Sequence, residues 1–238
     1  MPNTAQDTIN FIVPFCRYQS ANVGTNNMPI IGILNIVRNI ILAAPFTWSF
    51  NRAAVDLTGP VVKDSQDYSQ TIANFGFLEA ATANDGTNSF QFKDVYNNQA
   101  LASGGAGARP QAISVFSYSG AGSIVFRLSG VPDRPYTVNL VYQKLPVQFV
   151  SVTDPWAPIP DSFSDVYNNL ALGYYMDSCQ DPRAQQYIAR GIAGLIARAQ
   201  GLSQMDKMVF AAGYMQFNAM QMLEVLKTQQ GQQAQGAR

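Results

Sequence analysis

Two copies of one carboxylate-bearing string are the first candidates for chemistry in this chain. DVYNN occurs at residues 94–98 and 165–169, and the surrounding FKDVYNNQAL and FSDVYNNLAL agree at eight of ten positions. A hydrolase hypothesis pairs Asp94 with Asp165 as acid and base, which requires both carboxyls within about 10 Å in one cleft. The first copy follows the alternating SFQF, however, and the second lies in a helical pattern. We therefore interpret the repeat as one string in two structural contexts.

Other reactive groups are scarce. The chain contains no histidine, which excludes Ser-His-Asp and Cys-His nucleophile pairs and histidine-ligated zinc. Cys16 and Cys179 lie far apart without CxxC spacing, so we expect two reduced, buried thiols. The glycine-rich run SGGAGARP, residues 103–110, lacks the Lys-Ser/Thr of a phosphate loop and precedes a strand, so we expect an exposed loop able to contact a partner. The sequence predicts no enzyme activity, no cofactor and no metal.

The composition favours an assembly subunit. Hydrophobic residues make up 47% of the chain and charged residues 13%, against about 25% charged in ordinary soluble domains. Fifteen basic residues balance fifteen acidic ones, so no net field attracts nucleic acid or an anionic membrane. A sparsely charged surface of this kind is suited to burial against partner chains.

Neither a membrane span nor a secretory signal is predicted. The apolar segment at residues 28–46 carries Asn35, Arg38 and Asn39 in its middle, which are costly in hydrocarbon. We expect it to be a buried or interface helix that is covered on more than one side. The start MPNTAQDTIN has no basic or apolar signal region, so we expect synthesis in the cytosol.

The apolar periodicity changes twice along the chain. Helical spacing in residues 4–15, where Thr4 and Asp7 form a capping box, and in residues 28–46 gives way at Thr47 to alternation. Candidate strands are FTWSFNR, SQTIANFGFLEAATA, SFQFKDV, AISVFSYS, SIVFRLS and YTVNLVYQK, separated by turn signals. We therefore predict an α+β fold, in which an antiparallel β-sandwich or barrel is inserted into a helical frame.

Helical spacing returns after Pro160. Asp161 is the predicted N-cap of one helix, a second begins at Asp181, and Ser203 with Asp206 caps a third. The methionines of the last helix either pack in the core or line a partner groove. The predicted domains are residues 1–46 (N-terminal helices), 47–150 (inserted all-β domain), 151–227 (C-terminal helices) and 228–238 (polar, flexible tail).

Several strings in this order resemble a known family. The segments PFTWSFNR, FRLSGVPDRPYTVNLVYQKLPV and WAPIPDSFSDVYNNLALGYY, followed by paired helices, resemble the head-to-tail adaptor proteins of tailed bacteriophages, the tail tubular A-type or connector proteins. Those proteins insert a β domain between long helices after a WTFN-like turn, which corresponds to residues 47–51. The resemblance extends from about residue 27 to residue 212.

The resemblance implies a virion structural protein at the neck of the particle. It would form a ring, typically a dodecamer, that binds the portal protein, receives the tail or nozzle protein and extends the channel for viral double-stranded DNA without sequence-specific binding. C-terminal segments of related adaptors dock on the portal, and the matching residues are Thr228, Gln229, Gln230, Gln232, Gln233 and Arg238. The neutral charge departs from the idea of a charged channel.

A second hypothesis of another class stays open. The β domain would be a tail or baseplate module that binds a carbohydrate or receptor. It would need exposed aromatic side chains, such as Tyr96 or Tyr118, that stack on sugar rings.

Overall fold

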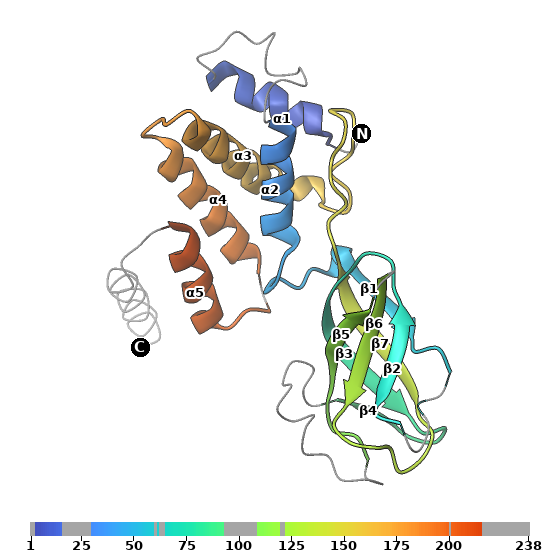
Figure 1. Ribbon diagram of the computed structural model, residues 1–238. Helices are drawn as coiled ribbons and strands as arrows, with labels where there is room; N and C mark the ends of the chain where they lie inside the picture. The colour runs from blue at the N-terminus through green and yellow to red at the C-terminus, as the bar shows by residue number, and fades with distance from the viewer. Residues whose placement is uncertain are drawn as a thin grey trace, which may run out of the picture. The chain divides into compact units, whose positions relative to one another are not determined.

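The computed structural model describes residues 3–15, 30–59, 61, 65–92, 109–119, 122–199 and 201–215. By the packing of its Cα atoms the chain forms two compact units. The helical unit comprises Met1–Phe46 and Gln148–Arg238, and the β unit comprises Thr47–Val147. Both helices and antiparallel sheets are present (Figure 1), which confirms the predicted α+β class. We retain the predicted domains, with boundaries at 46/47, 150/151 and 227/228, as a proposal.

The helical unit is built from α1 (Ala5–Ile12), α2 (Ile30–Leu42), α3 (Ser164–Ser178), α4 (Ala184–Arg198) and α5 (Gln204–Met215). Helix α3 packs against α2 and α4, and α5 packs against α4 (Figure 1). The contact between α3 and α4 is close because it is built on glycine: a Cβ at Gly191 would lie 2.5 Å from Cγ of Leu170.

The predicted caps of this unit have mixed outcomes. The carboxylate of Asp7 accepts hydrogen bonds from the backbone N–H of Thr4 (2.7 Å) and from its hydroxyl (2.8 Å). Ser203 accepts the Asp206 N–H at 3.1 Å and donates to its carboxylate at 2.6 Å. The prediction for Asp161 was wrong: a short 3-10 helix begins there, and its carboxylate instead accepts the N–H of Asn3 at 2.9 Å. Helix α4 begins at Ala184, three residues after the predicted start.

The β unit is a sandwich of two antiparallel sheets and not a closed barrel. Strands β1 (Arg52–Asp56), β7 (Thr137–Lys144), β3 (Phe75–Asn84) and β4 (Ser89–Gln91) form one sheet in the order β1-β7-β3-β4. Strands β2 (Asp67–Thr71), β6 (Ser123–Leu128) and β5 (Ile113–Ser119) form the other in the order β2-β6-β5.

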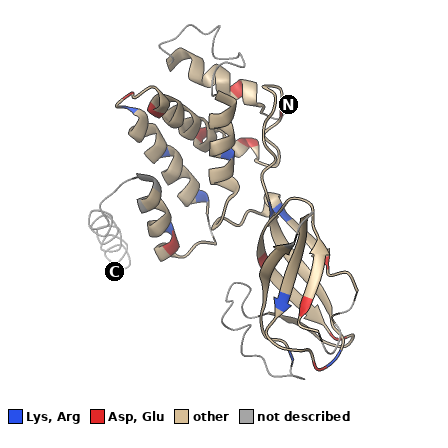
Figure 2. Ribbon diagram, in the orientation of Figure 1, with Lys and Arg blue, Asp and Glu red and all other residues tan. Residues whose placement is uncertain are grey.

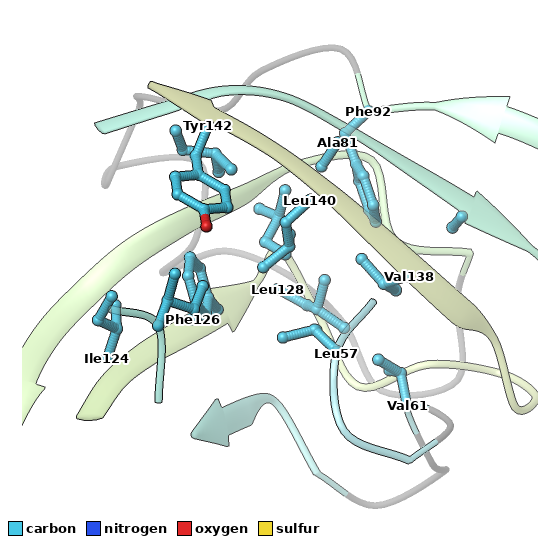
Figure 3. Close-up of a cluster of buried hydrophobic side chains, with 14 of the residues drawn as sticks. Leu57, Val61, Ala81, Phe92, Ile124, Phe126, Leu128, Val138, Leu140 and Tyr142 are labelled. Atoms are coloured by element: carbon cyan, nitrogen blue, oxygen red, sulfur yellow. The ribbon is translucent and has the colours of Figure 1, made fainter. Parts of the chain in front are cut away.

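Alternate residues of each strand fill the space between the two sheets. Ile124, Phe126 and Leu128 of β6 and Val138 and Leu140 of β7 are buried, and Figure 3 shows them in one cluster. This alternation is the period-2 pattern that the sequence carries, because successive side chains of a strand point to opposite faces.

Two predicted strands differ from the observed ones. The run SQTIANFGFLEAATA is not one strand, because Asn74 has a positive φ of 56° and turns the chain between β2 and β3. FTWSFNR is not a strand either: Ser49–Asn51 form a 3-10 helix, and β1 begins only at Arg52. The carboxamide of Asn51 donates to the carbonyl of Lys144 at 2.8 Å, which fixes this turn to the end of β7.

Helix α2 is the apolar segment considered above as a membrane span. Among the residues that the structure describes, no helix is long and apolar enough to cross a bilayer. The observed helix has 13 residues.

Candidate interaction surfaces

No cluster of metal-ligating side chains occurs in the part of the chain that the structure describes, where no three His, Cys, Asp or Glu residues lie together. Asp165 pairs with Arg198 at 2.8 Å on the surface of the helical unit. Its predicted partner Asp94 lies outside the described residues, so their separation stays untested. Cys179 is a free, exposed thiol, which makes the prediction of a buried one wrong.

Most of the predicted contact residues also lie outside the described ranges, as does the second thiol, Cys16. This applies to Tyr96, to residues 103–108 of the glycine-rich run and to the portal-docking candidates Thr228, Gln229, Gln230, Gln232, Gln233 and Arg238. Portal docking through these residues therefore stays a prediction.

The three polar residues of α2 all contact the extended segment at residues 148–160. The carboxamide of Asn35 donates to the Phe149 carbonyl at 3.1 Å and accepts the Phe149 N–H at 2.7 Å. Asn39 accepts a hydrogen bond from the carboxamide of Gln148 at 3.0 Å. Residues spaced by three or four share one side of a helix. The polar side chains that make a membrane span unfavourable thus bind the 148–160 segment to α2.

Arg38, on the same side of α2, carries a buried charge. Its guanidinium donates to the carbonyl of Ala157 and lies 4.4 Å from the ring centroid of Phe149. Burial lowers the pKa of Arg38, while Tyr167 and Asp154 oppose that shift. A guanidinium remains charged even so. The buried charge is therefore stabilised by a carbonyl dipole and an aromatic face.

The N-terminal residues are bound to the other side of the 148–160 segment. Backbone hydrogen bonds join Ala5 N–H to the Asp154 carbonyl (3.0 Å) and Trp156 N–H to the Asn3 carbonyl (2.9 Å). The Trp156 ring stacks on Tyr167 of α3 with centroids 4.6 Å apart. Hydrogen bonds and ring stacking therefore join residues 3–6, the 148–160 segment, α2 and α3.

Helix α2 carries an uncovered stripe. Ile36 is 48% exposed, and Gly32, one turn earlier, is exposed with no atom within 4 Å of a Cβ built on it. Val150 is 88% exposed and follows Phe149, which is bonded to Asn35 beside Ile36. We call Gly32, Ile36 and Val150 the α2 stripe. The prediction that this helix is covered on more than one side is confirmed by its contacts with α1, α3 and the 148–160 segment, and the α2 stripe is a part of it that stays exposed among the described residues.

A second uncovered stripe lies on α5. Phe210 faces inward, with its ring 4.5 Å from that of Phe46, and Ala211 is buried. Met205 and Val209, one turn apart, are 68% and 66% exposed. We call these two residues the α5 stripe. Core packing was the wrong prediction for Met205; the hypothesis of a partner surface fits its exposure.

Two exposed aromatic side chains lie on β5. Phe116 stands at a bulge, and the guanidinium carbon of Arg127 lies 3.3 Å from its ring centroid. Arg127 also pairs with Asp67 on β2 at 2.6 Å. Tyr118 lies directly opposite the buried Ile124 in the pairing of β5 with β6. Its side chain is therefore on the face of the sheet opposite to that of Phe116. The two rings do not form one platform on which a sugar ring could stack. They therefore do not support the carbohydrate hypothesis.

Charge is dispersed over both units. By sequence the helical unit contains eight basic and eight acidic residues, and the β unit contains seven of each. Figure 2 shows the described ones scattered singly over helices and strands. Most are engaged with a neighbour, as Arg52 is with Glu79 and Arg183 with Asp181. No concentrated basic surface is therefore found among the described residues.

Sequence reasoning missed both stripes as specific surfaces. The apolar periodicity predicted apolar residues around most of α2, but it did not indicate which of them would stay exposed. The one signal was the pairing of glycine with isoleucine at i and i+4 in Gly32 and Ile36, next to Asn35 and Asn39, which bind the 148–160 segment.

A protein-family model matches most of the chain. The family model described as SU10 adaptor protein matches residues 38–231. The match includes the whole β unit together with α3, α4 and α5. No curated protein matches the chain.

Proposed function

The chain belongs to the SU10 adaptor protein family, and from that membership we propose that it is a ring subunit at the head-to-tail junction of a bacteriophage. At family level it is a structural adaptor of the virion. In our proposal the ring, a dodecamer, binds the portal protein on one side and the tail or nozzle protein on the other. The family match, which covers the β unit and the helical unit from residue 38 to residue 231, is the observation that carries the proposal.

The surfaces support assembly as the mode of action. The α2 and α5 stripes are apolar, exposed and held by packed helices. Apolar patches that a single chain leaves uncovered are typical of sites where another chain binds. The protein would thus work through contacts with copies of itself and with neighbouring virion proteins, and not through a reaction.

The ring proposal is tested with the protein and its portal. The purified chain, alone and mixed with the portal protein, is examined by native mass spectrometry and by electron microscopy. We expect closed rings or ring-on-portal complexes. A chain that remains monomeric and leaves the portal unoccupied at micromolar concentration would exclude the ring proposal.

Attachment to the portal is proposed to use residues 228–238, which contain five glutamines and end in Arg238. Deletion of these residues should leave the far-UV circular dichroism spectrum unchanged and weaken capture on immobilised portal. A matched variant replaces the same residues by Gly and Ser at equal length, which separates the effect of sequence from that of length. Equal capture of all three proteins would reject this docking role.

A further inference from the structure

Residues 3–15 are held against the helical unit by segments that are distant in the sequence. Helix α1 is followed by a short 3-10 helix, Val13–Phe15, and packs on α3 and α2 (Figure 1). We call residues 3–15 the N-terminal arm, and the 148–160 segment with Asp161 and α3 its seat. The arm lies outside the family match, which begins at residue 38, whereas the seat lies inside it. The matched part of the chain thus binds a segment that is outside the match.

The arm is attached to its seat mainly through the backbone. Thr4 and Pro155 are antiparallel partners. The two hydrogen bonds between Asn3–Ala5 and Asp154–Trp156 come from the residues on either side of this pair. A proline fits at such a position, because the pair itself contributes no N–H to the bonds between the two segments. Backbone bonds of this kind bind any extended segment whose side chains fit the neighbouring surface.

The start of α1 is stabilised by residues of the arm itself. The Asp7 carboxylate accepts the Thr4 N–H at 2.7 Å, and the carboxamide of Gln6 donates to that of Asn10 at 3.0 Å. The buried apolar side chains of α1 are few, namely Ala5, Ile9 and Ile12. An arm that carries its own helix cap makes the same contacts with the seat of any copy of the chain.

The contact also buries a polar group without a partner. The side chain of Thr8 in α1 is fully buried, and its hydroxyl has no hydrogen-bond partner among the described residues. An unpaired buried hydroxyl is unfavourable, and release of the arm would return it to water. The arm is therefore bound less firmly than a helix with all its polar groups paired, which suits a contact that opens during assembly.

We infer that the N-terminal arms are exchanged in the assembled ring, so that the seat of each copy holds the arm of the preceding copy. Such an exchange needs no new complementary surface, because the contacts are those that the single chain already makes. Each copy gives one arm and receives one, and this head-to-tail relation closes into a ring. The inference rests on the proposed ring and names a contact that joins its subunits.

The connection between the arm and α2 is long enough for this exchange. It consists of residues 16–29, and fourteen residues span at most about 50 Å. A compact unit of the length of the helical unit has a radius of gyration of about 14 Å. The arm can thus extend beyond its own unit without any change in the packing of α2.

Disulfide trapping of Thr4 and Pro155 tests the exchange. Antiparallel partners with this bonding pattern have Cα atoms about 4.5 Å apart, which suits a disulfide. Cys16 and Cys179 are replaced by Ser, and Thr4→Cys is combined with Pro155→Cys in one chain. Oxidised as a monomer, this chain should become internally linked. Oxidised after assembly with the portal, it should give a ladder of covalent multimers on a denaturing gel without reductant.

A matched control and the remaining outcomes separate the alternatives. Thr4→Cys with Val209→Cys, an exposed residue of α5 outside the seat, should give neither the internal link nor the ladder. Rings that release only internally linked monomers would overturn the inference and leave the proposed function standing. Multimers that stop at the dimer would show reciprocal exchange in pairs and overturn it, as would the absence of any disulfide. Wild-type chains that form no rings and leave the portal unoccupied would remove both proposals.

Two substitutions in α1 test the exchange without cysteine chemistry. Ile9→Asp places a charge in the buried contact, whereas Phe11→Asp alters a side chain of the same helix that is 38% exposed. For Ile9→Asp we expect the concentration at which half of the rings dissociate to rise about tenfold or more. For Phe11→Asp it should stay within about twofold of the wild-type value. Native mass spectra of diluted rings measure both, and equal ring stability of Ile9→Asp and the wild-type chain would contradict the inference.

Discussion

At the scale of single residues, Arg38 shows how a charge is accommodated inside the helical unit. The side chain is buried, its guanidinium is bonded to the Ala157 carbonyl, and its Nε has no partner among the described groups. Leaving a buried charge without its partner destabilises the fold. Replacing the charged side chain by an apolar one of similar volume often costs little stability. Arg38 is thus a structural anchor for the 148–160 segment.

The anchor role predicts different effects for two substitutions. Arg38→Ala should lower the free energy of unfolding by about 3 kcal/mol, because it leaves a cavity and an unpaired carbonyl. Arg38→Met retains most of the apolar contact with Phe149, and we expect a loss of about 1 kcal/mol. Urea titrations followed by far-UV circular dichroism measure both. Equal losses would show that packing of the side chain does not matter.

The pair of Asp67 and Arg127 predicts a pH effect in the β unit. The Arg127 guanidinium holds the pKa of Asp67 below its ordinary value, which is about 3.9 in an unfolded chain. A depressed pKa stabilises the folded state above the unfolded value, and that stabilisation is lost as pH falls through the folded value. Wild-type protein should therefore lose its advantage over Asp67→Asn below about pH 4. Because the pair is largely exposed, the advantage is at most about 1 kcal/mol. Thermal unfolding of both proteins from pH 7 to pH 3 measures it, and a constant difference in Tm would contradict the assignment.

Local signals at this scale were predictable, and tertiary ones were not. The bonds of Thr4 with Asp7 and of Ser203 with Asp206 form within one helical turn, so the sequence suffices to place them. Asp161 instead bonds to Asn3, 158 residues away. The exposure of Cys179 and Met205 could not be predicted from the sequence either, because it depends on which other parts of the chain pack against these side chains.

At the scale of elements, the hydrophobic period identified most helices and strands, and each error has a specific structural cause. β2 and β3 were merged because Ile72 continues the alternation, while Asn74, with its positive φ, turns the chain between two strands that belong to different sheets. Trp48 and Phe50 mimic a strand face, yet the carboxamide of Gln143 donates to the Trp48 carbonyl at 3.2 Å and the chain turns there. Neither the bond nor the turn is encoded in periodicity.

Two glycines on different helices predict opposite effects of the same substitution. Gly191→Ala places a Cβ against Leu170 in the contact between α3 and α4, and overpacking of this kind costs about 1–3 kcal/mol. Gly32→Ala meets no atom and improves helix propensity, so the free energy of unfolding should rise by up to about 1 kcal/mol. Urea unfolding of the isolated chain measures both, with wild-type protein as reference. Destabilisation by Gly32→Ala would indicate that another part of the chain covers the α2 stripe.

At the scale of the whole molecule, the balance of charge distinguishes this chain from a nucleic-acid-binding protein. Each unit has as many acidic as basic residues, and the described charges are dispersed (Figure 2). A subunit of this kind, proposed to surround DNA, would let DNA pass instead of holding it, because affinity for phosphates comes from clustered Lys and Arg. The lack of a basic surface among the described residues is thus consistent with the function that we propose for the ring.

Weak binding of double-stranded DNA is the corresponding prediction. A fluorescently labelled duplex titrated with assembled protein at low salt should show a Kd no tighter than about 10 µM, independent of sequence, within the range usual for non-specific contacts. A shallow dependence on salt is expected, because few counterions are released when few phosphates are neutralised. A matched variant, Asp165→Lys, adds positive charge to the exposed start of α3 and should bind more tightly with a steeper salt dependence. Submicromolar binding by the wild-type ring with a steep salt slope would contradict this prediction.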